Sequence, residues 1–220
     1  MNENTETLAI FPLPNLVLFP GIVVPLKVFE PRYLEMMGDV MREEGFIGIV
    51  TLKPGWEAEY ENNPSVYEVG CKGLVVKCDQ ADDESLHVLI RGVGKFRIVN
   101  EIEGKSYRRA EVIPISDVDA AELDSIGNQL RQELLTQLVD CGDRFINIEQ
   151  VNELSELDTN VFINAMSFVS PFETSSKQFL LEAENVTERY RKYIQLAEFS
   201  LCKQRAQASR TFSSGHNSLH

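Results

Sequence analysis

The stretch IFPLPNLVLFPGIVVPLKVFEPRY, residues 10–33, places five prolines and one glycine in an otherwise apolar run. Proline has no N–H group to donate to a sheet ladder. Pro12 and Pro14 therefore predict that the first short apolar strand lies at a sheet edge or ends there. Pro25 interrupts a second apolar run, residues 22–29, which is expected to form a broken strand.

Between these two runs, Phe19-Pro20-Gly21 predicts a sharp turn. Pro20 restricts its own φ to about −65°, and Gly21 tolerates a positive φ that few other residues adopt. After the second run, Pro31 suits the first turn of a helix. Apolar residues then recur at three- and four-residue spacing up to Gly45, which predicts one short amphipathic helix.

The leader, as we call residues 10–33, reads FPL-x-x-x-V-L-F-P-G-x-x-x-P-L-x-x-F-E-P-R-Y from Phe11 to Tyr33. This pattern resembles the start of the Lon N-terminal domain, the substrate-recognition part of the Lon protease, and especially its stand-alone bacterial versions. Two later segments also resemble family motifs: RGVGKFRI at 91–98 is similar to its G-x-x-R-F-R-I strand, and residues 177–189 to its helical tail. The resemblance covers roughly residues 8–200.

The hydropathy pattern changes period once along the chain. Strand-like patterns with β-branched residues and intervening turns continue after the first helix at 46–52, 66–78, 86–98 and 107–115. Helix-like spacing then follows at 119–141, 147–154, 158–170, 175–184 and 185–201.

These patterns predict an α+β chain with about six strands and one short helix before a helical bundle. The family resemblance implies that the β part is a PUA-like β-barrel. We expect the barrel over residues 1–117, the helical bundle over 118–203 and a disordered tail over 204–220, because the tail has no apolar pattern.

Composition excludes several classes of protein. The 220 residues carry 21 Lys and Arg against 34 Asp and Glu, a formal net charge of −13 that is spread over both halves, so neither half is typical of a nucleic-acid arm. The start MNENTETLAI is not typical of a secretory signal, and no window reaches 18 apolar residues. We therefore expect a soluble protein of the cytoplasm, and the family resemblance implies a bacterial one.

Residues suited to catalysis or metal binding are few. Four cysteines, at 71, 78, 141 and 202, match neither a zinc pair nor a disulfide framework, and three histidines are too few for a metal site or a triad. Cys71 and Cys78 are seven residues apart on one predicted strand, which predicts that they point to opposite faces. We expect no metal and no cofactor.

The ATPase and peptidase of a complete Lon protease are not expected in this chain. Gly94-Lys95 would need glycine at position 89 and Ser or Thr at 96 to form a phosphate loop, but Leu89 and Phe96 stand there. No G-x-S-x-G elbow is present, and no serine has the context that the Lon peptidase uses. The chain is therefore predicted to be non-catalytic.

The resemblance implies a protein-recognition module that binds unfolded or apolar protein segments, or a protease partner, through the leader. The candidate binding residues are Pro14, Phe19, Pro20, Phe29, Arg32 and Tyr33. Two alternatives stay open for Phe19-Pro20: the helical half covers this apolar turn, or the turn is exposed and binds a partner. Arg32 and Glu30 either contact a peptide or serve the helix start and a neighbouring loop.

The alternative function is a PUA-like module that binds RNA or a small ligand. Basic residues gather at Arg91, Lys95, Arg97, Arg108 and Arg109, but the acidic surroundings and the scarcity of interleaved aromatic residues disfavour nucleic acid. No membrane partner is expected. A homodimer is compatible with this sequence, which does not specify the oligomeric state.

Overall fold

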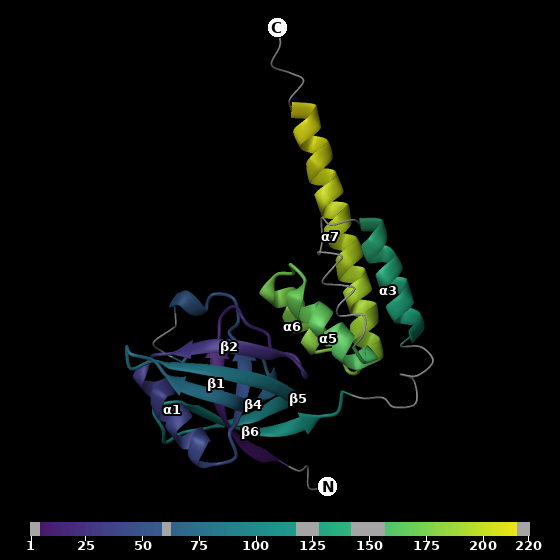
Figure 1. Cartoon of the computed structure of the whole chain (residues 1–220). Helices are drawn as coiled ribbons and strands as arrows, with labels where there is room; N and C mark the ends of the chain where they lie inside the picture. Colours follow the sequence, from purple (N-terminus) through teal and green to yellow (C-terminus); the bar gives the residue numbers. More distant parts are fainter. Residues whose placement is uncertain (1–4, 59–62, 118–127, 142–156, 215–220) are drawn as a thin grey trace.

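The computed structural model describes residues 5–58, 63–117, 128–141 and 157–214 (Figure 1). Side chains are not described at 128, 130, 137–141 and 201–214. The first half contains β1 Glu6–Leu13, β2 Val23–Val28, α1 Pro31–Arg42, β3 Phe46–Thr51, β4 Val69–Gln80, β5 Leu86–Ile102 and β6 Arg108–Ile115. The second half contains α3 Asn128–Cys141, α5 Thr159–Val169, α6 Thr174–Leu181 and α7 Val186–Ser214.

The strands form one sheet in the order β2-β5-β4-β3-β1-β6, with a further pairing between β5 and β6. The β1–β3 pair is parallel and the other pairs are antiparallel. Strand β5 can pair with both β2 and β6 because it is 17 residues long. Its first half pairs with β2 and its second half with β6. A β-rich first half followed by helices is confirmed, whereas the PUA-like barrel and the extent of the bundle stay predictions.

The prolines within β1 and β2 lie at positions where the sheet needs no N–H donor. Pro12 lies within β1, but at that position only β3 pairs with it, since the β6 pairing ends at Ile10. Pro25 lies in β2, an edge strand whose only neighbour is β5. Gly92 N–H donates to the Ile22 carbonyl, so the two-residue alternation turns the Pro25 backbone toward the free edge.

The predicted turn between the two leader strands is confirmed. Gly21 has a φ of +83°, and Ile22 N–H donates to the Phe19 carbonyl at 3.2 Å. The turn packs directly on the backbone of β5, where Gly21 N–H donates to the Gly92 carbonyl at 2.8 Å. A Cβ atom at Gly92 would lie 2.2 Å from the Phe19 carbonyl oxygen, so this close approach requires glycine.

The four described helices of the second half, α3, α5, α6 and α7, pack on one side of the sheet. Figure 1 shows α7 passing beside α3, α5 and α6 and then continuing beyond them. One half of the predicted capping box at its start is present, since Asn185 Oδ1 accepts from Glu188 N–H at 2.8 Å. The Glu188 carboxylate reaches back to the N–H of Glu184.

Three sequence-based expectations for the helical half have different outcomes. The prediction of a disordered tail from Gln204 does not hold for residues 204–214, because α7 continues to Ser214. This part of the helix contains good helix formers such as Ala, Gln and Arg. Asp158 stands at the start of α5 but makes no side-chain capping bond. The predicted helix at 147–154 and residues 119–127 of the first one lie outside the described residues.

The prediction that Cys71 and Cys78 face opposite sides of β4 is wrong. Both side chains belong to the same apolar cluster, Cys71 as a buried member and Cys78 as a partly buried one. The register of β4 against β5 shifts between Val75 and Lys77, which indicates a bulge at this point. One extra residue reverses the alternation of side chains along a strand and so restores Cys78 to the inner face.

The cores of the two halves are not separate. One apolar cluster contains Val17, Phe19 and Val69 of the first half together with residues of the four described helices of the second half, among them Phe162 and Tyr190. A second cluster lies beneath α1 and a third lies beneath β1 and β6. The leader turn is thus part of the apolar core that joins the halves.

We expect Gly92→Ala to lower the free energy of unfolding by about 2 kcal/mol or more, because the added methyl group collides with the Phe19 carbonyl. Gly94→Ala is the matched control, since no atom lies within 4 Å of its Cβ position, and its change should stay within about 0.5 kcal/mol. Urea unfolding followed by circular dichroism measures both. Equal stability of the two variants would contradict the close approach.

Candidate functional site

The structure places the six candidate binding residues in different environments. Phe19 is fully buried and Tyr33 is 5% exposed, whereas Phe29 is 66% exposed. Pro14, Pro20 and Arg32 are half-buried. The six residues therefore do not form one exposed patch, and their role in binding stays a prediction.

Of the two alternatives for the Phe19-Pro20 turn, the structure has the covered one. The Phe19 ring lies in the core cluster shared with the helices, and the Arg189 guanidinium lies 5.8 Å from its centroid. Asn164 Nδ2 of α5 donates to the Pro20 carbonyl at 3.0 Å. The turn is an internal joint between the sheet and the helices.

Arg32 and Glu30 interact with each other at the corner before α1. Their ion pair is 2.8 Å long, and the Arg32 guanidinium stacks 4.7 Å from the centroid of the Tyr33 ring. Tyr33 in turn contacts Phe11, with ring centroids 4.6 Å apart. The Glu30 carboxylate makes no capping bond to the helix N–H groups, so that part of the structural alternative is wrong.

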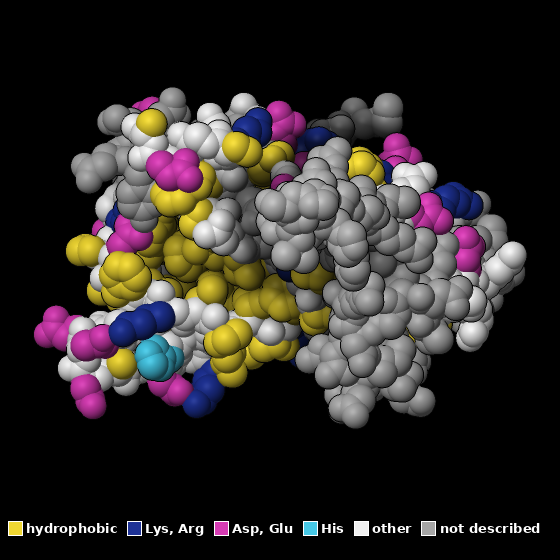
Figure 2. Space-filling view, turned by 90° about the horizontal axis from the view of Figure 1, so that it is seen from above, with side chains coloured by type: hydrophobic (Ala, Val, Ile, Leu, Met, Phe, Trp, Pro, Cys, Tyr) yellow, Lys and Arg dark blue, Asp and Glu magenta, His cyan; other side chains and the backbone are white. Residues whose placement is uncertain are grey.

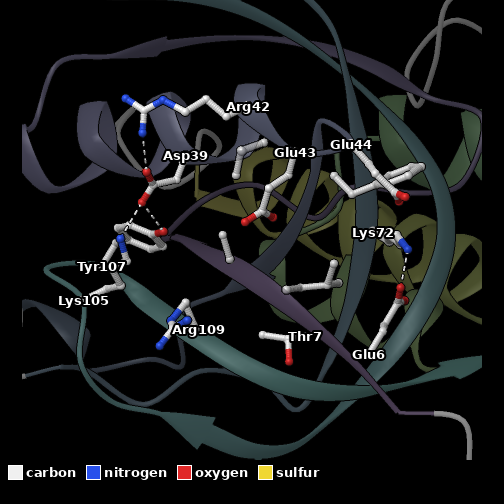
Figure 3. Close-up of a pocket in the computed structure, with 14 residues that line it drawn as sticks. Glu6, Thr7, Asp39, Arg42, Glu43, Glu44, Lys72, Lys105, Tyr107 and Arg109 are labelled. Carbon is white, nitrogen blue, oxygen red and sulfur yellow. Dashed lines mark hydrogen bonds and ion pairs between the residues drawn. The ribbon is translucent and has the colours of Figure 1, made fainter.

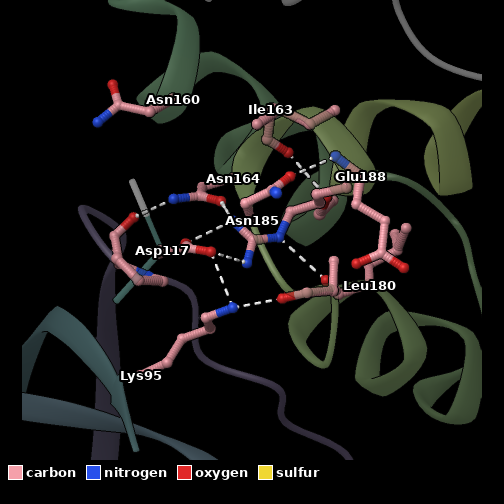
Figure 4. A network of polar contacts seen from close by, with 12 residues as sticks. Lys95, Asp117, Asn160, Ile163, Asn164, Leu180, Asn185 and Glu188 are labelled. Atoms are coloured by element: carbon pink, nitrogen blue, oxygen red, sulfur yellow. Dashed lines mark hydrogen bonds and ion pairs between the residues drawn. The ribbon is translucent and has the colours of Figure 1, made fainter. Parts of the chain in front are cut away.

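A buried network of polar side chains joins the two halves (Figure 4). Its centre is the Asp117 carboxylate, which accepts from both terminal nitrogens of Arg189 at 2.7 and 2.8 Å. The same carboxylate pairs with Lys95 Nζ of β5 at 2.8 Å. The Arg189 side chain is fully buried and that of Lys95 is 1% exposed.

Backbone carbonyl groups and one amide complete this network. Arg189 Nε donates to the Leu180 carbonyl at 3.0 Å, and its Nη1 donates to Asn164 Oδ1 at 2.6 Å. Lys95 Nζ donates to the Ala183 carbonyl at 2.5 Å. Burial, together with the nearby Arg189 charge, lowers the pKa of Lys95.

Sequence reasoning did not identify this network, although a signal was present. Val186, Tyr190 and Tyr193 form the apolar face of α7, and Arg189 lies on the same face. A charged residue within an apolar stripe indicates a buried partner, because a lone ion is costly to bury. The identity of that partner, Asp117, could not be read from spacing, since 72 residues separate the two.

An apolar hollow lies on the face seen from above in Figure 2. Partly buried apolar side chains of both halves pack against one core cluster, among them Leu16, Ile22 and Leu26 of the leader and Phe168 of α5. We use the name apolar hollow for the hollowed apolar face of Figure 2, and we infer that these four side chains contribute to it.

Exposed apolar residues adjoin the same segments. Val23 in β2 is 48% exposed, Phe29 directly after β2 is 66% exposed, and Val169 at the end of α5 is 45% exposed. Single exposed apolar residues are ordinary, but their association with a hollowed apolar face is typical of a binding surface. This face is the best candidate for a functional site in the described structure.

The described residues offer little for catalysis at this face. No three His, Cys, Asp or Glu side chains among them lie close enough to hold a metal ion. Burial raises the pKa of Cys71 to about 12, so its thiol stays protonated near neutral pH. None of the described helices is long and apolar enough to cross a membrane.

Residues 7–198 match the family model of the ATP-dependent protease La (LON) substrate-binding domain. The chain is 29% identical over 200 residues to Lon protease 2 of Sorangium cellulosum, covering 86% of this chain and 24% of that protein. It is 30% identical over 128 residues to Lon protease 2 of Syntrophobacter fumaroxidans, covering 57% of this chain and 16% of that one. The chain thus spans a quarter or less of the length of these two relatives.

Solved structures with this fold are known. A Lon N-terminal domain protein from Xanthomonas campestris has a TM-score of 0.60 at 21% identity, covering 86% of this chain and 98% of that one. The N-terminal domain of Mycobacterium avium complex Lon protease has a TM-score of 0.68 at 17% identity, covering 88% and 98%. At such identities these likenesses show the fold alone.

We expect Asp117→Asn to lower the free energy of unfolding by about 3–5 kcal/mol, because it leaves Lys95 and Arg189 buried without an anion. Asp79→Asn is the control, since Asp79 pairs with Lys77 on the surface and such pairs contribute little. Urea unfolding measures both variants. A small loss in Asp117→Asn, equal to that of the control, would show that the network does not join the halves.

Proposed function

We propose, since this chain belongs to the Lon substrate-binding domain family, that it binds segments of other proteins and catalyses no reaction itself. The observation that supports this proposal is the apolar hollow of Figure 2, to which we assign side chains of the leader and of α5. The ligand it fits is an unfolded polypeptide segment with apolar side chains, because such side chains gain most from leaving water on an apolar face.

The segment is held by its side chains more than by pairing with β2. Pro25 lies at the middle of the free edge of β2 and has no N–H group to offer. Continuous addition of a strand is therefore interrupted there. Leu26 and Phe29, on either side of the end of β2, supply apolar contacts instead.

Charge and exposure set the strength and selectivity of this binding. With a formal net charge of −13, the chain repels acidic segments and favours neutral or basic ones. A few apolar anchors give only modest affinity, because ordering an unfolded partner costs free energy, so dissociation constants in the micromolar range are expected. Binding through apolar contacts should also persist in salt.

The absence of catalysis is supported by the residues already described. The phosphate-loop pattern is missing around Gly94-Lys95, and Lys95 itself is buried against Asp117. We infer further that the strands close into a PUA-like barrel, that the protein acts in the cytoplasm, and that it presents bound segments to a protease.

RNA binding is less well supported than protein binding. Arg108 is ion-paired with Glu101, and Arg97 lies 3.7 Å from a carboxylate oxygen of Glu68. Lys95 is buried. Most of the basic group that suggested RNA is therefore neutralised by the protein itself.

We expect Phe29→Asp to weaken the binding of an unfolded protein about fivefold or more, because it replaces the most exposed apolar side chain of the leader with a charge. Reduced and alkylated lysozyme, which is basic and unfolded, is the probe, and fluorescence anisotropy measures its dissociation constant. Phe29 is exposed, so the variant should fold. Phe19→Asp is not a test of binding, because Phe19 is fully buried and a charge there would destabilise the core.

Phe199→Asp is the matched control. Phe199 is 68% exposed on α7 and belongs to none of the apolar clusters. The same substitution there adds the same charge away from the hollow. If both variants bind unfolded lysozyme as tightly as the parent, or if both lose the same affinity, the apolar hollow is not the binding site.

A further inference from the structure

A pocket of about 400 Å³ lies between the end of α1 and strands β1 and β6 (Figure 3). We call it the α1 pocket. Leu8 and Ile10 of β1 point into the core beneath β6, so the alternation along the strand turns Thr7 and Ala9 to the opposite face. Helix α1 covers that face over Phe11 but ends at Arg42, and the start of β1 is left as the floor of a pocket.

One wall of the α1 pocket is fixed by hydrogen bonds among its own residues. Asp39 accepts from Tyr107 Oη at 2.8 Å, from Lys105 Nζ at 2.9 Å and from Arg42 Nη1 at 2.9 Å. The bonds from Lys105 and Tyr107 lower the pKa of Asp39. Burial, and then the Asp39 carboxylate, raise the pKa of Tyr107 to about 12. This wall keeps its charges at neutral pH and needs no ligand.

Arg109, which lines the pocket from β6, differs from these residues. Its Nη2 donates to the Glu103 carbonyl at 3.1 Å, but its Nε is buried and has no acceptor. No ion pair joins Arg109 to a carboxylate in the part of the chain that the structure describes. Buried donors nearly always have a partner, and a half-buried guanidinium normally has an anion.

The neighbouring arginine shows what Arg109 lacks. Arg108 points to the other face of β6, where it pairs with Glu101 and donates to the Pro64 carbonyl at 2.7 Å. Arg109 lies opposite Ala9 in the β1–β6 register, and the methyl group of Ala9 leaves the space in front of the guanidinium open. A carboxylate in this space would supply the missing acceptor after a small rotation of the guanidinium.

Two further carboxylates of the pocket determine which anions could bind at Arg109. Glu43 and Glu44 line the pocket beyond the last turn of α1, are exposed, and make no ion pair among the described residues. Glu43 and Arg109 both influence the titration of Tyr107, so both charges lie near its hydroxyl group. A dianion such as phosphate would meet repulsion here, whereas a ligand with its own cationic group would not.

We propose that the α1 pocket binds a small zwitterion of the amino-acid class, with its carboxylate on Arg109 and its ammonium group toward Glu43 and Glu44. Free amino acids and short peptides both carry this chemistry. The inference does not depend on protein-segment binding at the apolar hollow, because no residue is shared between the two sites. The contact is shallow and made by few groups, so affinity in the millimolar range is expected.

The test uses the complete ¹⁵N-labelled protein and follows the Nε–H signal of Arg109 and the amide signals of Thr7 and Ala9 by NMR. The probes are 4-aminobutyrate, triglycine, acetate and inorganic phosphate. We expect 4-aminobutyrate or triglycine to shift all three signals with a dissociation constant of about 1–10 mM, and acetate and phosphate to bind at least about threefold more weakly. Comparing the first two probes separates a free amino acid from a peptide as the source.

Arg109→Met should weaken this binding at least tenfold. Arg97→Met is the matched control, because Arg97 is exposed on β5 and absent from the pocket, and it should bind as the parent does. Should Arg109→Met fail to fold, Ala9→Leu fills the pocket floor and is expected to cause the same loss.

The proposal is overturned by any of three results. One is the absence of shifts with 4-aminobutyrate and triglycine up to about 50 mM. Another is an unchanged affinity in folded Arg109→Met or Ala9→Leu. The third is binding of acetate or phosphate as tight as that of the zwitterions, which would show a site for anions in general.

Discussion

The two halves of this protein depend on one buried carboxylate. Asp117 follows the last strand closely and pairs with Lys95 from the sheet and Arg189 from the last helix. Two cations and one anion are a costly set to bury, and they are tolerated only because carbonyl groups of Leu180 and Ala183 accept the remaining protons. Asp117, Lys95 and Arg189 come from three different segments and each is a hydrogen-bond or ion-pair partner of another member. The network therefore fixes the position of the helices on the sheet.

This constraint explains the place of the leader. The Phe19 ring lies beside the Arg189 guanidinium, and the Pro20 carbonyl accepts from Asn164, which also accepts from Arg189. The proline and glycine that make the leader recognisable thus shape a turn that is locked between Gly92 and the helices. In the function that we propose, the leader shapes the adjacent apolar hollow, while its Phe19 ring is buried in the core.

The two proposed binding surfaces, one apolar and one polar, are separate in this fold. We assign the apolar hollow to side chains of the leader and of α5, which come from different halves of the chain. The α1 pocket lies where a helix ends before the strand beneath it does. In both places the surface arises from a mismatch in length or coverage between neighbouring elements, and such mismatches are common origins of ligand sites.

The sequence alone determined the order of strands and helices, the turn at Phe19-Pro20-Gly21 and the capping box at Asn185, because these follow from local period and backbone chemistry. It also determined family membership through motifs such as the leader. Only the tertiary structure decided that Phe19 is covered, that Asp117 pairs with Arg189 and that Arg109 Nε is buried with no acceptor among the described residues. Those features depend on contacts between residues far apart in the chain. The inward position of Cys78 depends on a bulge in β4 that reverses side-chain alternation. Neither kind of feature leaves a regular pattern in the sequence.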